Sequence, residues 1–491
     1  MKKFKTDNYS ESAELPEKNL SEKLRKAYFW IANHAIISPY YDIEYNFKTF
    51  TSFTIDKSVV NLPSEQSYSS YVLLPLLTLV TRKKCLLVGG PGRGKTASSF
   101  LMGVLAGYSI KEIKRGMQHG QPQMTVSDLL GNPLPSDLMS AKSMEDIKIA
   151  WRKWLDMKVK IIDEYNRIPT RTQSALLTVL ADNYAEMFDQ VKQCPESAWY
   201  LTANDDSGGG TYEVIEALKD RIDIVVKALH FNTRFLKELL LRIEENFRPE
   251  EIVPKDIIFT EEEIEQISKD ILKVEIPFEI LRRIEFFASQ FELSESAAEQ
   301  IEYKTKDTLK LSGGNFINIS ESDKDKVKDL SIQTKNGLSV RALMTAITYI
   351  KALAYFRGNT EVEFEDVKHI LPFVLHDKLI QNTSAGFFEI PENQVYKTDK
   401  ISWIKKLFDL SCAEYSRLNM DKEDKVASLQ KEFETDFEYI TIGETERRIK
   451  KIENLLAELS KNKKISSYQY DDILKLKYMH QKYTVYKSLL L

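Results

Sequence analysis

The chain has 491 residues, which is too long for one ordinary hydrophobic core and predicts about three domains. Lysine and arginine number 69 against 73 aspartates and glutamates, a formal net charge of −4, so the overall charge gives no reason to expect a polyanionic partner. The three cysteines, Cys85, Cys194 and Cys412, lie far apart, which excludes a disulfide framework or a metal-type spacing and indicates a reducing compartment.

The first residues, "MKKFKTDNYSESAEL", contain lysines but no apolar segment of the kind found in secretion signals. The longest apolar run, "YVLLPLLTLV" at residues 71–80, is too short to span a bilayer. We therefore expect a cytoplasmic protein that does not enter a membrane.

The N-terminal part predicts helices that lead into a nucleotide-binding core. Residues 1–45 are expected to form a helical extension, because "LSEKLRKAYFWIANHA" has apolar residues at helical spacing. The run at 71–80 is interpreted as a buried helix, broken or kinked near Pro75.

The apolar strand "CLLV" at 85–88 is followed by "GGPGRGKT", which fits the phosphate-loop pattern G-x-x-x-x-G-K-[ST]. Backbone N–H groups of such a loop, together with the dipole of the helix that follows, can hold a polyphosphate. Lys95 is expected to reach the β- and γ-phosphates and Thr96 to ligate Mg²⁺. The alternative is a chance glycine-rich turn. The residues predicted to bind nucleotide here are Gly89, Gly90, Pro91, Gly92, Arg93, Gly94, Lys95 and Thr96.

A second strand, "VKIID", ends in an acidic pair. Asp163 at its end can hold the Mg²⁺ shell, and Glu164 can polarise the water that attacks the γ-phosphate. A phosphate loop alone would leave GTPases, kinases and many ATPases open, and an acidic pair alone is common on protein surfaces. Together at this spacing they are a specific signal for nucleotide hydrolysis.

Alternating short apolar runs and helical stretches over 46–230 predict an α/β core with a largely parallel sheet, and Thr170 with Gln173 predicts a capping box at the start of the helix after Pro169. Residues 231–385 are expected to be all helical, with a capping box formed by Thr260 and Glu263, and 386–491 to be a helical C-terminal extension. In that extension, "ETERRIKKIENLLAELSKN" carries an apolar stripe that either packs on the helix at 470–490 in a hairpin or docks a partner. The stripe consists of Ile449, Ile452, Leu455, Leu456 and Leu459.

Three segments together resemble the AAA+ ATPases, and within them the MoxR group (RavA-like). They are "DEYNRIPTRTQSALL", "TANDDSGGGTYEVIEALKDRID", and "GLSVRALMTAITYIKALAYFRG" with "VEFEDVKHILPFVLHDKL" after it. The resemblance covers roughly residues 70–380 and implies an AAA+ phosphate-loop core followed by an all-α lid.

The resemblance also implies roles for three further residues. Asn204 would orient the lytic water, Arg221 would reach the nucleotide of a neighbouring subunit as an arginine finger, and Arg341 would contact the γ-phosphate from the same subunit. The alternatives are a turn-forming asparagine, a surface salt bridge with Asp220 or Asp223, and a solvated arginine at a helix start.

The chain also departs from the group's pattern. Tyr165 replaces a common aliphatic residue, Asp205 a common proline, and Glu213 and Ile215 frequent prolines, which indicates a divergent branch. The segments at 120–138 and 186–199 resemble an insertion and a hairpin that face the pore in rings of this type, although ordinary surface loops are the alternative.

The function predicted from the sequence is Mg²⁺-dependent ATP hydrolysis by a ring, a homo-hexamer by resemblance, that remodels or activates a protein client. The client could carry a von Willebrand factor A domain, as partners of this group often do. Two alternatives stay open: a nucleic-acid-linked motor of restriction or defence type, against which the absence of a recognised DNA-binding module argues, and a scaffold that binds nucleotide without hydrolysing it.

Overall fold

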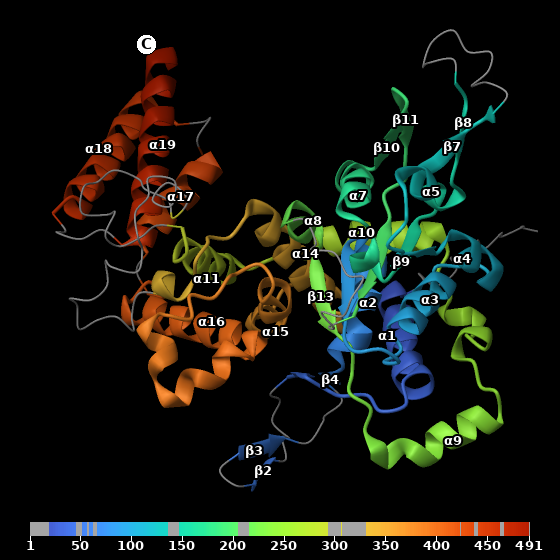
Figure 1. Ribbon diagram of the computed structural model, residues 1–491. Helices are drawn as coiled ribbons and strands as arrows, with labels where there is room; N and C mark the ends of the chain where they lie inside the picture. The colour runs from blue at the N-terminus through green and yellow to red at the C-terminus, as the bar shows by residue number, and fades with distance from the viewer. Residues whose placement is uncertain are drawn as a thin grey trace, which may run out of the picture.

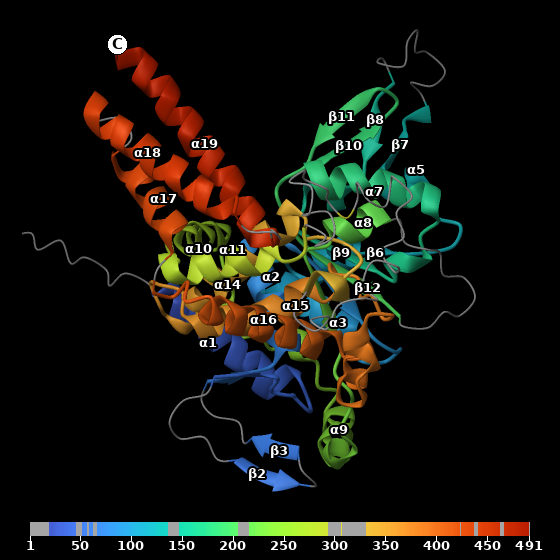
Figure 2. The same cartoon turned by 90° about the vertical axis from the view of Figure 1, so that its left-hand side faces the viewer.

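The computed structural model describes residues 19–45, 52–55, 58–61, 66–135, 147–204, 216–292, 306, 330–422, 424–436, 440–461 and 466–490. The expected features at Asp205, Gly210, Thr211, Tyr212, Glu213 and Ile215, and the end of the 120–138 insertion, lie outside these residues. Figure 1 and Figure 2 show a central α/β body with a group of helices on one side that ends in the long C-terminal helix.

The centre of the body is a five-stranded sheet in the order β13-β5-β12-β9-β6. All of its pairings are parallel, and Tyr200 of β12 lies opposite both Cys85 of β5 and Ile161 of β9. The parallel sheet with flanking helices confirms the predicted α/β core. The strands are β5 (Lys84–Val88), β6 (Gln118–His119), β9 (Val159–Asp163), β12 (Ala198–Ala203) and β13 (Ile224–Lys227).

Alternate residues of each strand enter two different cores, because successive side chains of a strand point to opposite faces. Cys85 and Leu87 join the larger core, which contains α2 (Ser70–Thr81) and α3 (Lys95–Leu105). Leu86 joins the other core, under α5 (Val126–Leu130), α7 (Thr170–Asp182) and α8 (Glu216–Arg221). The sheet is therefore covered by helices on both faces, as an all-parallel sheet requires.

The lid is all helical and packs on α2 and on the β13 edge of the sheet. The N-terminal helix α1 (Leu20–Trp30) lies against α14, and Tyr28 packs edge to face on Phe356, with ring centroids 5.6 Å apart. The predicted capping box of Thr260 and Glu263 is present at the start of α10. The lid helices are α10 (Glu261–Lys273), α11 (Phe278–Ser289), α14 (Val340–Arg357), α15 (Phe364–Leu375) and α16 (Lys400–Arg417).

The inclusion of α16 in the lid differs from the boundary that we expected at residue 386. Trp403, Leu407 and Phe408 of α16 are buried in the larger core, and α16 contacts both α15 and α11. Because its apolar face completes the lid, the separate C-terminal part begins only after α16.

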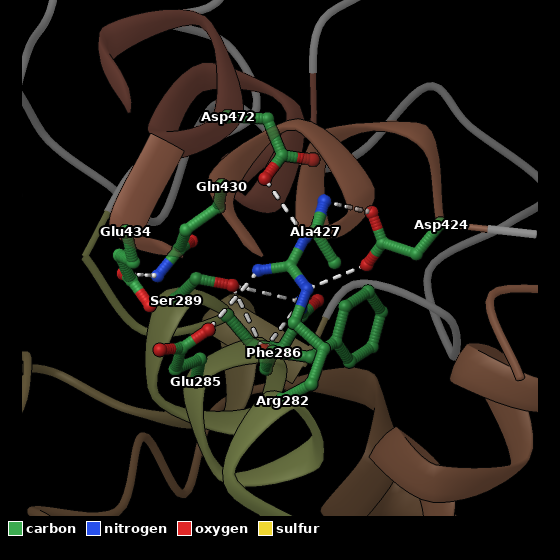
Figure 3. A network of polar contacts seen from close by, with 10 residues as sticks. Arg282, Glu285, Phe286, Ser289, Asp424, Ala427, Gln430, Glu434 and Asp472 are labelled. Carbon is green, nitrogen blue, oxygen red and sulfur yellow. Dashed lines mark hydrogen bonds and ion pairs between the residues drawn. The ribbon is translucent and has the colours of Figure 1, made fainter. Parts of the chain in front are cut away.

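That C-terminal unit consists of α17 (Lys425–Asp436), α18 (Ile442–Leu459) and α19 (Ser467–Leu490), with a small core of its own. The α18 stripe predicted from the sequence packs against α19 in a hairpin. The unit is fixed to the lid by Arg282 of α11, which lies between Asp424 and Asp472 (Figure 3). Arg282 Nε donates to Asp424 at 2.6 Å and Nη2 to Asp472 at 2.9 Å.

Two local expectations were wrong. The helix α2 is not broken at Pro75, since it runs from Ser70 to Thr81 with every residue buried. The helix α7 has no capping box, because Gln173 instead donates its side-chain amide to the Ile168 carbonyl.

Two hairpins project side by side from the body, on the side of α5 and α7 (Figure 1 and Figure 2). They are β7 (Gly131–Pro133) with β8 (Ile149–Trp151), and β10 (Tyr184–Met187) with β11 (Gln190–Gln193). In the described residues, 120–135 contains α5 and the first strand of one hairpin, and 186–199 contains the turn and the second strand of the other.

Elsewhere, α9 (Leu236–Glu244), which follows β13 in the chain, stands out from the body (Figure 1). Other small elements are α4 (Ile110–Gly116) and the antiparallel pairs β1 (Ile43–Glu44) with β4 (Ser67–Tyr68) and β2 (Ser52–Ile55) with β3 (Ser58–Asn61). No helix among the described residues is both long enough and apolar enough to cross a membrane.

Candidate nucleotide site

The phosphate loop connects β5 to α3 at the carboxyl edge of the sheet. Gly92 and Gly94 have φ of +73° and +74°, a left-handed conformation that glycine adopts without strain. Gly94 is the N-cap of α3, so the helix starts directly after the loop with its first N–H groups facing the loop's concave side. This is the backbone geometry that anion binding needs.

Lys95, the first residue of α3, is buried and lies across the loop. Its Nζ donates to the Gly89 carbonyl at 2.5 Å, to the Gly90 carbonyl at 2.8 Å and to Asn204 Oδ1 at 2.9 Å. The ammonium group is therefore held inside the curve of the loop.

Asp163 ends β9 and receives two hydroxyl donors on one oxygen. Thr96 Oγ1 donates to Asp163 Oδ1 at 2.7 Å, and Thr202 Oγ1 donates to the same atom at 2.6 Å. On the other oxygen, Oδ2, His119 Nδ1 lies 3.6 Å away. A hydroxyl and a carboxylate side by side are oxygen ligands of the kind that Mg²⁺ takes when phosphates and water complete its shell, so the donor set fits this ion.

Glu164 follows directly, in a left-handed conformation with φ of 53°. Its N–H donates to Thr202 Oγ1 at 2.9 Å, its Oε1 accepts from Asn204 Nδ2 at 3.0 Å, and its Oε2 lies 3.1 Å from Arg167 Nε. The backbone turn thus aims the carboxylate at Asn204 and away from the strand.

Asn204 connects the two halves of the site, because its oxygen accepts from Lys95 while its NH₂ donates to Glu164. One amide therefore joins the phosphate-loop lysine to the acidic residue expected to act on water. This contact brings together residues that are more than 100 positions apart in the sequence.

Sequence reasoning missed several residues that complete this site. Thr202 and His119 lie at the ends of β12 and β6, in register with the strand that carries Asp163. Gly120 was also missed: a Cβ there would lie 2.1 Å from the Glu164 carbonyl oxygen, so only glycine allows the two strands to approach. These residues could have been predicted only from the alignment of neighbouring strands in the sheet, which the sequence does not give directly.

An apolar cavity of about 240 Å³ adjoins the phosphate loop at Gly92, Arg93 and Gly94. Its walls come from the end of the N-terminal helix, from α2 and α3, and from the segment after β13. They include Ile36, Ile37, Tyr71, Ala97, Leu229 and Phe231. A flat apolar base could enter this cavity while its phosphates lie on the loop, so the site fits a nucleotide.

Arg221 and Arg341 lie at the opposite edge of the sheet from this cluster. Arg341 Nη1 donates to Asp220 Oδ2 at 2.6 Å, and the nearby Asp223 is bonded through its backbone N–H to the Lys84 carbonyl, at the amino end of β5. The phosphate loop follows the carboxyl end of that strand. Arg341, which the resemblance implied contacts the γ-phosphate of its own subunit, thus lies toward the amino end of β5, and the phosphate loop lies at the other end of that strand.

Comparison with known protein families identifies part of the lid. Residues 328–395 match the family model described as the AAA lid domain. The fold is that of an AAA+ protein. The AAA+ lid match begins just before α14 and ends before α16, so α16 extends the lid beyond the matched segment.

Among solved structures, the chain resembles the 2.00 Å crystal structure of a proposed ATPase from Cytophaga hutchinsonii. The two are 20% identical over 68% of this chain and 89% of that one, with a TM-score of 0.47. This likeness is too distant to carry a functional argument. None of the curated proteins matches the chain.

Proposed function

We propose that this AAA+ protein is a Mg²⁺-dependent ATP hydrolase of the MoxR type. The observation that carries the proposal is the bridge through Asn204, which joins Lys95 of the phosphate loop to Glu164. A chance glycine-rich turn would have no reason to be tied in this way to an acidic residue on a different strand.

Each residue of the cluster has a role that its contacts support. Lys95 and the loop N–H groups would hold the β- and γ-phosphates, and Thr96 and Asp163 would hold Mg²⁺, which neutralises phosphate charge when bound. Glu164 would accept the proton of the attacking water, and Asn204 would fix the position of that carboxylate and of the water. Thr202 keeps Asp163 and Glu164 in place through its two hydrogen bonds.

The same proposal includes assembly into a ring, with a homo-hexamer as the expected form. Arg221 and Arg341 are too far from their own phosphate loop to act on it, yet a neighbouring subunit packed head to tail could receive them. Exposed apolar side chains are available for such packing. They are Leu236, Leu240 and Ile243 of α9, which stands out from the body, and Val340 and Met344, which flank Arg341 in the sequence.

The MoxR assignment rests on the "DEYNR" segment and on the two projecting hairpins, which we propose handle a protein client. We infer that the ring remodels or activates that client, and that a protein with a von Willebrand factor A domain is a candidate partner. Encoding next to such a protein would support this part of the proposal.

A mixing experiment tests the shared site. Subunits with Arg221→Ala and subunits with Glu164→Gln should each be inactive alone, because each variant lacks one half of every site. Mixed rings contain some interfaces with an intact Glu164 and an intact Arg221, so partial ATP turnover should return. If mixed rings form and no turnover returns, the trans role of Arg221 is wrong, and a wild-type ring without turnover would support a scaffold.

A further inference from the structure

The last helix, α19, has two apolar faces on opposite sides. One face carries Leu476, Met479 and Tyr483, which are buried in the C-terminal unit. The other carries an outer stripe, defined here as Leu474, Tyr478, Val485 and Leu489, whose exposed fractions are 43%, 51%, 46% and 77%. Because each residue turns the helix by about 100°, the four residues of the outer stripe lie in a sector of roughly 60° around the helix axis, on the side away from the buried residues.

The spacing of the outer stripe is that of a helix–helix seam. Leu474, Tyr478, Gln481 and Val485 follow one another at steps of four, three and four residues, which is the spacing of a heptad seam. Gln481 is the polar member of this series. A polar residue inside an otherwise apolar seam is typical of specific helix pairing. It is unfavourable for a face that enters a lipid surface, and the stripe contains no tryptophan or phenylalanine.

From Lys475 onward the charged side chains that flank the outer stripe are all basic, while the acidic Asp471 lies one turn before Leu474. Lys475 and Lys482 lie along one side of it and Lys477 along the other, and from Ile473 to Leu491 the sequence has no acidic residue. Within the described part of the chain, none of these three lysines forms an ion pair, while Lys482 stands 5.7 Å from the ring centroid of Tyr478. A second copy of the same helix would bring lysines against lysines, which argues against self-pairing.

We propose that the outer stripe of α19 is a docking site for an amphipathic helix of a different protein, with acidic residues flanking its apolar seam. The apolar seam supplies the contact area, and the three lysines select the charge of the partner. Asp472, near the start of the same helix, pairs with Arg282 of the lid, so a partner bound along α19 is linked to the lid through α19 (Figure 3).

The test uses three designed helical peptides that share a leucine seam and carry glutamate, glutamine or lysine on both flanks. Binding to the full chain is measured by fluorescence anisotropy without nucleotide, so the result does not depend on the proposed ATPase activity. The glutamate peptide should bind about tenfold tighter than the glutamine peptide, because three exposed ion pairs each add little, and the lysine peptide should bind weakest. Added salt should reduce the difference.

Variants of the chain locate the site. Tyr478→Glu with Val485→Glu should weaken binding of the glutamate peptide at least about tenfold. Leu272→Glu, which changes an exposed leucine on α10 (68% exposed), is the control and should have no effect. Replacing Lys475, Lys477 and Lys482 by glutamate should reverse the preference towards the lysine peptide. Circular dichroism confirms that each variant is folded.

Several outcomes would overturn the proposal. They are equal binding of all three peptides, no binding of any, or an equal loss in the Leu272→Glu control. Stripe-dependent binding to phosphatidylserine vesicles that exceeds peptide binding would identify a membrane surface instead. Stripe-dependent self-association in sedimentation would identify a second copy of the chain.

Discussion

Arg282 is predicted to hold the C-terminal unit on the lid, and Arg282→Met should loosen that attachment. The side chains of Arg282, Asp424 and Asp472 are 12%, 9% and 10% exposed, so water screens the two ion pairs little. Removing one partner of a buried pair leaves uncompensated charge and costs about 3–5 kcal/mol. The equilibrium for undocking should therefore shift by roughly two to three and a half orders of magnitude.

The loss of stability should be confined to the contact between the lid and the C-terminal unit. An apolar contact across the attachment remains, with Phe286 packed on Tyr468 at a centroid distance of 5.0 Å, and the C-terminal unit keeps its own core. Hydrogen exchange should therefore become faster at α11 and at the first turn of α19, and stay unchanged around Leu476 and Met479.

The same variant should respond to acid. Burial holds the pKa of Asp472 above its ordinary value, and Arg282 opposes this shift. Without Arg282 the folded-state pKa rises further. A carboxyl whose folded pKa is raised stabilises the folded form at low pH, and this contribution is lost as pH rises through the folded value. Lowering the pH should therefore restore docking in Arg282→Met.

A triple variant serves as the control. Arg282→Met combined with Asp424→Asn and Asp472→Asn removes the buried charges together and should recover most of the docking, because the penalty comes from unpaired carboxylates. Exchange in Arg282→Met at the wild-type rate, or a triple variant as loose as the single one, would refute this reasoning.

Four further outcomes are expected. Lys95→Ala should abolish ATP binding, whereas Glu164→Gln should retain binding and stop hydrolysis; equal loss of binding in both would mean that their roles are misassigned. Gly120→Ala should slow hydrolysis more than it weakens ATP affinity, as measured by turnover and by nucleotide titration, because its methyl group would displace the Glu164 backbone. Burial lowers the pKa of Lys160 from 10.5 to about 8, so the wild type should gain stability relative to Lys160→Met as pH rises from 8 to about 10.5, where the unfolded chain holds more protons; an unfolding free energy that changes with pH equally in both proteins, measured by urea unfolding, would contradict this. Deleting residues 421–491 should preserve ATP binding in a folded protein, and loss of affinity would mean that this region completes the pocket.

Much of the nucleotide site could be predicted because its signal is local. The phosphate loop and the acidic pair are continuous motifs, and parallel strands bring their carboxyl ends to one edge of the sheet. Thr202, His119 and the cavity walls could not be found in this way, since they depend on sheet register and on contacts between distant segments. The direction in which Arg341 points was also beyond the sequence, because it depends on how the lid packs on α2.

The helical parts were predicted less completely. The helical spacing of apolar residues predicted α18 and its apolar stripe. That spacing does not indicate which part of the protein covers the stripe, and in the structure α19 covers it. The outer stripe of α19 escaped notice because two opposite apolar faces cancel any net periodic signal. The boundary expected at residue 386 differs from the structure for a similar reason. The sequence of α16 does not show whether its apolar face packs on α15 or on a later helix.

Because α19 is attached to the lid near its start, a rotation of the lid moves the far end of α19 the most. The helix is fixed near its start through Asp472 and continues to Leu490, about 27 Å further at 1.5 Å per residue. A lid rotation of about 10° would move that far end by about 5 Å, close to the pitch of one helical turn. A partner bound near the far end of α19 would therefore be displaced by about this distance when the lid rotates, and one bound near Asp472 by much less.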